Sequence, residues 1–140
     1  MFIEQTEVAA KMLEEQTKGR IESQLAEDGS QPHELARTLP WGYSQMNLMG
    51  FFELARLAEN VNIDLWNYTS PGGKSIKIAY LWMLPYAEGK PWEYQQIKPV
   101  DISGFINLSR IAAAKYPDID IASFLKQHTG DQKALSVLTR

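Results

Sequence analysis

The sequence predicts an all-α protein. Apolar residues recur at helical spacing along most of the chain, and no segment shows the sustained alternation of a half-buried strand. Clusters of Gly, Pro, Asn and Ser separate the helical stretches. With 140 residues, of which 44% are hydrophobic and 22% charged, the chain is long enough for one globular domain with its own core.

The first half of the chain predicts two long helices. The first runs from about Thr6 to Leu25, and the turn cluster Glu27–Pro32 ends it. The second runs from about Gly42 to Glu59 and begins just after Pro40, at a place where a helix tolerates proline. Because apolar side chains surround much of this second helix, we expect it to be the most buried one.

Three more helices are predicted downstream, at about Lys74–Tyr86, Ile102–Lys115 and Ile119–Gln127. The turn signal Ser70–Gly73 precedes the first of them, and a loop rich in Pro, Trp and Tyr, Gly89–Pro99, follows it. Tyr116–Asp118 separates the last two helices, because residues before proline avoid the helical region. A short segment then ends at Arg140.

Composition and motifs exclude several classes of function. A net charge of −3 without a basic stripe argues against nucleic acid, and no apolar run is long enough to predict a membrane span. The chain has no cysteine, no cluster of metal ligands and no cofactor motif, so we expect neither a metal nor a cofactor. Gly72–Ser75 lacks the spacing and the preceding strand of a phosphate loop. The start at Met1 does not resemble a signal peptide.

The stretch from Asp28 to Asn47, DGSQPHELARTLPWGYSQMN, brings polar and aromatic residues to the start of a buried helix. This mixture suits a carbohydrate site, because aromatic rings stack on sugars and amides bind hydroxyl groups. The plainer alternative is structural: Arg37 pairs with Glu34, and Tyr43 is an ordinary core residue. Residue types alone favour this structural alternative.

Several short elements follow one another in this region: Gln31-Pro32, Glu34-Leu35, Arg37-Thr38, Tyr43 and Asp64-Leu65-Trp66-Asn67-Tyr68. In this order they resemble the C-terminal part of the alginate lyase family of polysaccharide lyases, over at least Lys18 to Ile97. The resemblance implies helical hairpins that form part of an incomplete α/α toroid, with a cleft for an acidic polysaccharide. It also implies β-elimination of uronic-acid polymers such as alginate.

The resemblance assigns roles to the residues of this stretch. Tyr43 becomes the candidate catalytic acid, or acid and base together, and Arg37 the residue that holds charge in the cleft. The candidate substrate-binding residues are Gln31, Glu34, Trp41 and Asn47, and Glu34 is also expected to orient Arg37.

One part of the family's machinery has no counterpart in residues 1–140. The family carries an Asn-His element upstream of the matched region, and His33 and His128 do not occupy that position. We therefore expect a partial domain that is impaired or inactive by itself, with a complementing N-terminal half or a second copy as a partner. The alternatives are a non-catalytic module that binds acidic glycans and a helical protein-interaction scaffold. Family members are typically periplasmic or secreted, but the sequence leaves the localisation open.

Overall fold

The computed structural model describes residues 2–94, 96 and 98–128, and the regular secondary structure in these residues is helical. No strand occurs in these residues, which confirms the predicted all-α class. The elements are α1 (Phe2–Gln24), α2 (Pro32–Leu35), α3 (Pro40–Glu59), α4 (Ile76–Ala87) and α5 (Ser103–Lys115), and residues 122–128 are also helical. The chain divides into two compact units, Met1–Asp101 and Ile102–Arg140.

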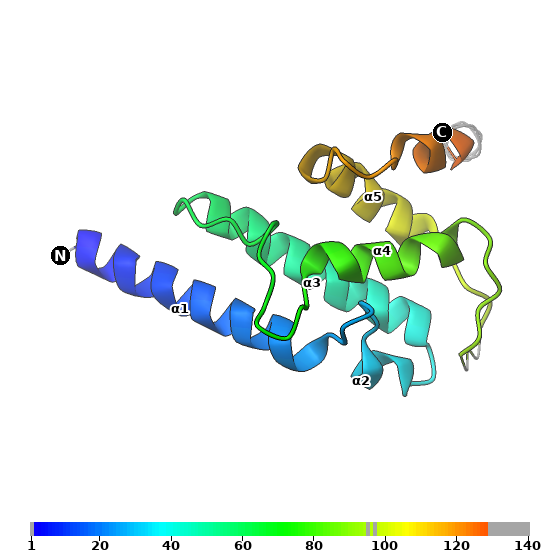
Figure 1. Ribbon diagram of the computed structural model, residues 1–140, viewed down its shortest axis with the longest axis horizontal. Coiled ribbons are helices and arrows are strands. Elements are labelled where there is room, and N and C mark those ends of the chain that lie inside the picture. The colour runs from blue at the N-terminus through cyan, green and yellow to red at the C-terminus, as the bar shows by residue number, and fades with distance from the viewer. Residues whose placement is uncertain (1, 95, 97, 129–140) are drawn as a thin grey trace, which may run out of the picture. The chain divides into compact units, whose positions relative to one another are not determined.

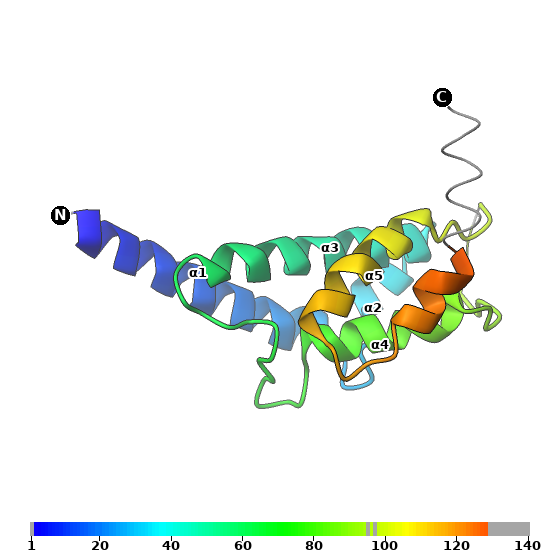
Figure 2. The ribbon, with the colours of Figure 1, turned by 90° about the horizontal axis from the view of Figure 1, so that it is seen from above.

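In the first unit, α1, α3 and α4 lie side by side and alternate in direction (Figures 1 and 2). The predicted helix limits are nearly right, and the differences have local causes. Pro40 occupies the first turn of α3, where a missing N–H costs nothing, so the helix begins two residues earlier than predicted. The Ser75 hydroxyl accepts a hydrogen bond from the Ile78 N–H at 3.1 Å and fixes the start of α4.

The core of the first unit lies between α3 and its neighbours. Leu48, Phe51, Phe52 and Ala55 of α3 are fully buried, as are Ile76, Ala79, Tyr80 and Met83 of α4. The Phe52 ring packs edge-on against Trp66 with centroids 5.0 Å apart. These apolar contacts supply the main stabilisation of the unit.

The expectation that the second long helix would be the most buried is wrong. In α3 eight of 20 residues are buried, whereas in α4 seven of 12 are buried. Met46 and Leu57, both counted in the apolar set of α3, are 68% and 55% exposed. Counting apolar residues around a helix does not say which of its faces a neighbour covers. Among the described helices, none combines the length and the hydropathy needed to cross a membrane.

The conformation of the loop between α1 and α2 requires a glycine at position 29. Its φ is +94°, in the region that only glycine adopts readily, and a Cβ at this position would overlap the backbone carbonyl of Ile78. The neighbouring Ser30 N–H bonds the Asp28 carboxylate at 2.9 Å. The loop therefore packs directly on α4 and sets the position from which α2 begins.

The second unit has a small core of its own. Phe105, Leu108 and Ala112 of α5 are buried, together with Ile121 and Phe124. The rings of Phe105 and Phe124 meet edge to face, with centroids 5.8 Å apart. The segment predicted to follow residue 128 lies outside the described residues.

Candidate functional site

Arg37 and Tyr43, the two candidate catalytic residues, are in direct contact. The guanidinium carbon of Arg37 lies 3.5 Å from the centroid of the Tyr43 ring, which is a close cation–π stack. Arg37 follows the one-turn helix α2, and Tyr43 lies in the first turn of α3. The Arg37 side chain is 51% exposed and Tyr43 is half-buried, so both groups are accessible.

Glu34 contacts Arg37 from the side. One of its carboxylate oxygens lies 3.6 Å from a guanidinium nitrogen, and the Glu34 side chain is 22% exposed. Such surface pairs contribute about 0 to 1 kcal/mol, so the pair orients the guanidinium more than it stabilises the fold. The structural alternative is therefore half right: the pair exists, but Tyr43 is not a core residue.

Gln31 and Asn47 form a hydrogen-bonded bridge to the first part of α3. Gln31 is 1% exposed, and its amide nitrogen donates to the Ser44 carbonyl at 3.0 Å. Its amide oxygen accepts from Asn47 Nδ2 at 2.9 Å, and the same nitrogen donates to Gln24 Oε1 at 3.2 Å. Both ends of the Gln31 amide are thus occupied, and the bridge ties α1, the loop before α2, and α3 together.

Trp41 is also enclosed by protein. The residue is 1% exposed, and its indole N–H donates to the Asp101 carbonyl at 3.0 Å. Its backbone N–H donates to Gln96 Oε1 at 3.3 Å. In this conformation Trp41 presents no ring face to a ligand, and the predicted substrate contacts of Gln31 and Trp41 do not follow from the geometry.

An aromatic cluster that the sequence did not assign to the site packs around Trp41. Trp92 meets Trp41 edge to face at 5.4 Å, and Trp92 also contacts Tyr86 and Tyr94, each at 5.1 Å between centroids. Burial, followed by the nearby Tyr86 phenol and the carboxylates of Glu93 and Asp28, raises the pKa of Tyr94. The signal for this cluster was present in the loop rich in Pro, Trp and Tyr.

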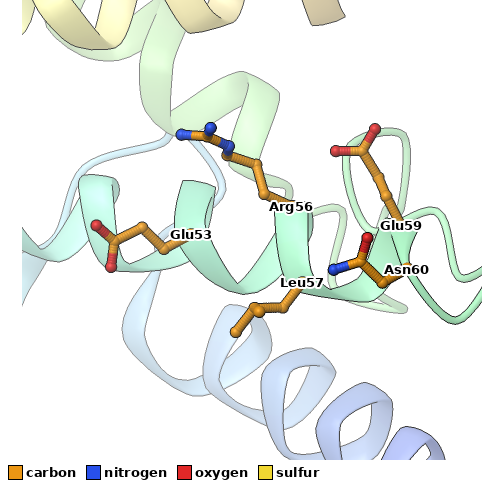
Figure 3. Close-up of a pocket in the computed structure, with 5 residues that line it drawn as sticks. All are labelled: Glu53, Arg56, Leu57, Glu59 and Asn60. Atoms are coloured by element: carbon orange, nitrogen blue, oxygen red, sulfur yellow. The ribbon is translucent and has the colours of Figure 1, made fainter.

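A large surface hollow lies at the other end of α3, away from these residues. It measures about 560 Å³ and is lined by Glu53, Arg56, Leu57, Glu59 and Asn60 (Figure 3). These side chains leave α3 in different directions, and none of the candidate site residues lines the hollow. Its polar groups do not converge on one point, so its size alone does not make it a binding site.

The two histidines do not form a second candidate site. His33 is exposed on α2, and His128 packs against the Phe124 ring at 4.7 Å. Within the described part of the chain, no group of three or more His, Cys, Asp or Glu side chains is placed to hold a metal ion.

Comparison with known proteins agrees with the resemblance seen in the sequence. The family model described as "Alginate lyase" matches residues 1–93. The crystal structure of an alginate lyase from Bacteroides ovatus is similar over 86% of this chain, with 34% sequence identity and a TM-score of 0.79. This chain spans 33% of that longer chain. Among curated proteins, none matches.

Proposed function

The chain belongs to the alginate lyase family, and on this premise we propose that Arg37 and Tyr43 are its share of a site that cleaves a uronic-acid polysaccharide by β-elimination. The observation that carries the proposal is the stack of the Arg37 guanidinium on the Tyr43 ring at 3.5 Å. A permanent cation and a phenol, both accessible, lie within the dimensions of one sugar ring. Alginate is the substrate that the family membership favours.

The chemistry of β-elimination explains why these two groups belong together. The proton on C5 of a uronate is only weakly acidic while the neighbouring carboxylate is charged, and negative charge grows on that carboxylate as the proton leaves. A guanidinium placed there stabilises the developing charge. A phenol can then protonate the departing glycosidic oxygen, or remove the C5 proton when it is ionised. We assign the first role to Arg37 and the second to Tyr43.

The remaining candidates act as supports in this proposal. Glu34 orients the guanidinium from 3.6 Å. Gln31, Asn47 and Trp41 are engaged in hydrogen bonds within the protein, so we assign them to holding α2 against the start of α3. A site needs such support, because a misplacement of about 1 Å can cost roughly a hundredfold in rate.

The proposed site is incomplete within these 140 residues. We propose that the family's Asn-His element, which has no counterpart in these residues, adds to Arg37 a further group that neutralises the carboxylate, and adds to Tyr43 a second group for proton transfer. On this account the chain alone binds oligouronates but turns them over slowly. A separately produced N-terminal half of a family member, bearing the Asn-His element, restores turnover.

The test follows ultraviolet absorbance of unsaturated uronate ends, with alginate as substrate and the N-terminal half added. We expect Tyr43→Phe to keep binding, measured by calorimetry, and to lower turnover at least about a hundredfold, the range of a lost acid or base. Arg37→Ala should weaken binding as well. His33→Ala is the matched control from the same segment and should behave as the unsubstituted chain.

The outcomes separate the candidate functions. No turnover after addition of the N-terminal half contradicts the enzymatic proposal. Binding without turnover, unchanged by that half, indicates a glycan-binding module instead. A chain that binds no oligouronate and forms a defined oligomer by light scattering indicates a protein-interaction scaffold.

A further inference from the structure

The segment after α4 forms a second hollow at the end of α3 that carries Tyr43. It measures about 490 Å³ and is lined by Trp92, Tyr94, Gln96, Lys98, Pro99 and Val100. This volume lies within the range of about 300 to 1,000 Å³ that small ligands occupy. Gln96 joins the hollow to α3, because its amide oxygen accepts the backbone N–H of Trp41, two residues before Tyr43. Figures 1 and 2 both show this segment beside the start of α3.

The lining of this hollow has the composition of a sugar site. The Trp92 and Tyr94 rings are half-buried, with centroids 5.1 Å apart and planes tilted by 56°, so their exposed parts offer apolar surface in two directions. Lys98 is exposed, and no carboxylate forms an ion pair with it among the residues that the structure describes. The hollow therefore combines stacking surface with an uncompensated positive charge.

Two further donors lie in the same lining. The indole nitrogen of Trp92 is buried and is not one of them. The oxygen of the Gln96 amide is engaged by Trp41, which leaves its NH₂ group as a donor. The Tyr94 phenol is protonated at neutral pH, as phenols ordinarily are, and burial raises its pKa further, so it can donate.

We propose that this hollow is a subsite for one uronate residue of the polysaccharide, next to the sugar held by Arg37 and Tyr43. The sugar ring packs against the exposed part of Trp92 or Tyr94, and its carboxylate faces Lys98 and the NH₂ group of Gln96. The proposal rests on the proposed function, because it places a neighbouring unit of the same polymer. It adds Trp92, Tyr94, Gln96 and Lys98 to the candidate site.

The test is a nuclear magnetic resonance titration of the full chain with short alginate oligosaccharides. We expect shifts of the Trp92 indole and the Lys98 amide signals. Lys98→Gln should weaken binding about two- to fivefold at low salt, the effect of losing one exposed charge pair, and added salt should shrink this difference. Lys11→Gln, on the exposed surface of α1, is the matched control and should bind as the unsubstituted chain does.

Each outcome decides between the subsite and the site at Arg37. If Arg37→Ala weakens binding while Lys98→Gln does not and residues 92–98 show no shifts, the subsite is overturned and the proposed function stands. If Lys98→Gln weakens binding and the signals of Trp92 and Lys98 shift, while Arg37→Ala has no effect on binding, the subsite stands and the proposed function fails. If a neutral oligosaccharide of the same length binds equally well and Lys98→Gln changes nothing, the hollow is not specific for uronate. If no oligouronate binds, both proposals fall.

Discussion

The two ends of α3 differ in how firmly their side chains are held. At the N-terminal end, Gln31, Trp41 and Asn47 are engaged in hydrogen bonds, and the Arg37–Tyr43 stack is accessible. The hollow at the C-terminal end, of about 560 Å³, is larger than the one of about 490 Å³ near the N-terminal end. Its side chains nevertheless point in different directions, and Leu57 is exposed to solvent (Figure 3). Side chains that are held in place and point toward one another therefore identify a candidate site better than the volume of a hollow does.

The largest effect on stability should come from a substitution at Gly29, in the loop that leads to the N-terminal end of α3. Gly29→Ala places a Cβ against the Ile78 carbonyl at a φ of +94°. Backbone strain and overpacking together should lower the free energy of unfolding by about 2 to 4 kcal/mol. Urea denaturation measures the loss. Gly50→Ala, where a Cβ meets nothing within 4 Å, is the control and should stabilise α3 slightly; equal stability of the two variants contradicts the claim that the loop is clamped.

The second largest effect on stability is expected at Asn47, which supports the site, and not at Arg37, which is proposed to react. Asn47→Ala leaves the buried amide oxygen of Gln31 without its donor, at a cost of about 1 to 3 kcal/mol. Arg37→Ala removes an exposed group and should change stability by less than about 0.5 kcal/mol. Thermal unfolding of both variants checks the difference. Similar losses for the two would show that Arg37 is also part of the scaffold.

A smaller, pH-dependent effect is expected where α1 meets the turn before α4. A hydrogen bond from the Ser70 hydroxyl, with the Gly72 N–H and Lys74 nearby, lowers the pKa of Glu22. Because the folded pKa is the lower one, the stabilisation by Glu22 is fully present above its ordinary pKa and is lost as the pH falls through the folded pKa. Glu22→Gln should therefore be less stable at neutral pH and converge with the unsubstituted chain in acid. A constant difference across pH would assign the loss to packing.

The smallest effect should come from the C-terminal end of α3. Leu57→Ser alters an exposed side chain and should change the free energy of unfolding by less than about 0.5 kcal/mol. Denaturation at several protein concentrations provides the measurement. A larger loss that depends on concentration would mean that this apolar surface is covered by a second copy in solution.

The sequence predicted the long helices well because their apolar spacing and the turn signals between them are local. It also brought Arg37, Glu34 and Tyr43 to one place, since they lie within ten residues of one another at a helix entrance. It missed α2, because a single turn of four residues carries no periodicity. The hydrogen-bond partners of Trp41 lie 55 and 60 residues away, and no local pattern reports on pairings at that range.

These distant partners of Trp41 also set where the chain can be shortened. The family match ends at residue 93, whereas Gln96 and Asp101 lie beyond it and the first compact unit ends at Asp101. A polypeptide trimmed at residue 93 would lose Gln96 and Asp101, which accept hydrogen bonds from two N–H groups of the enclosed Trp41. The family match therefore ends eight residues before the end of the compact unit that contains these hydrogen bonds. A shortened form of the protein made for expression should extend at least to residue 101.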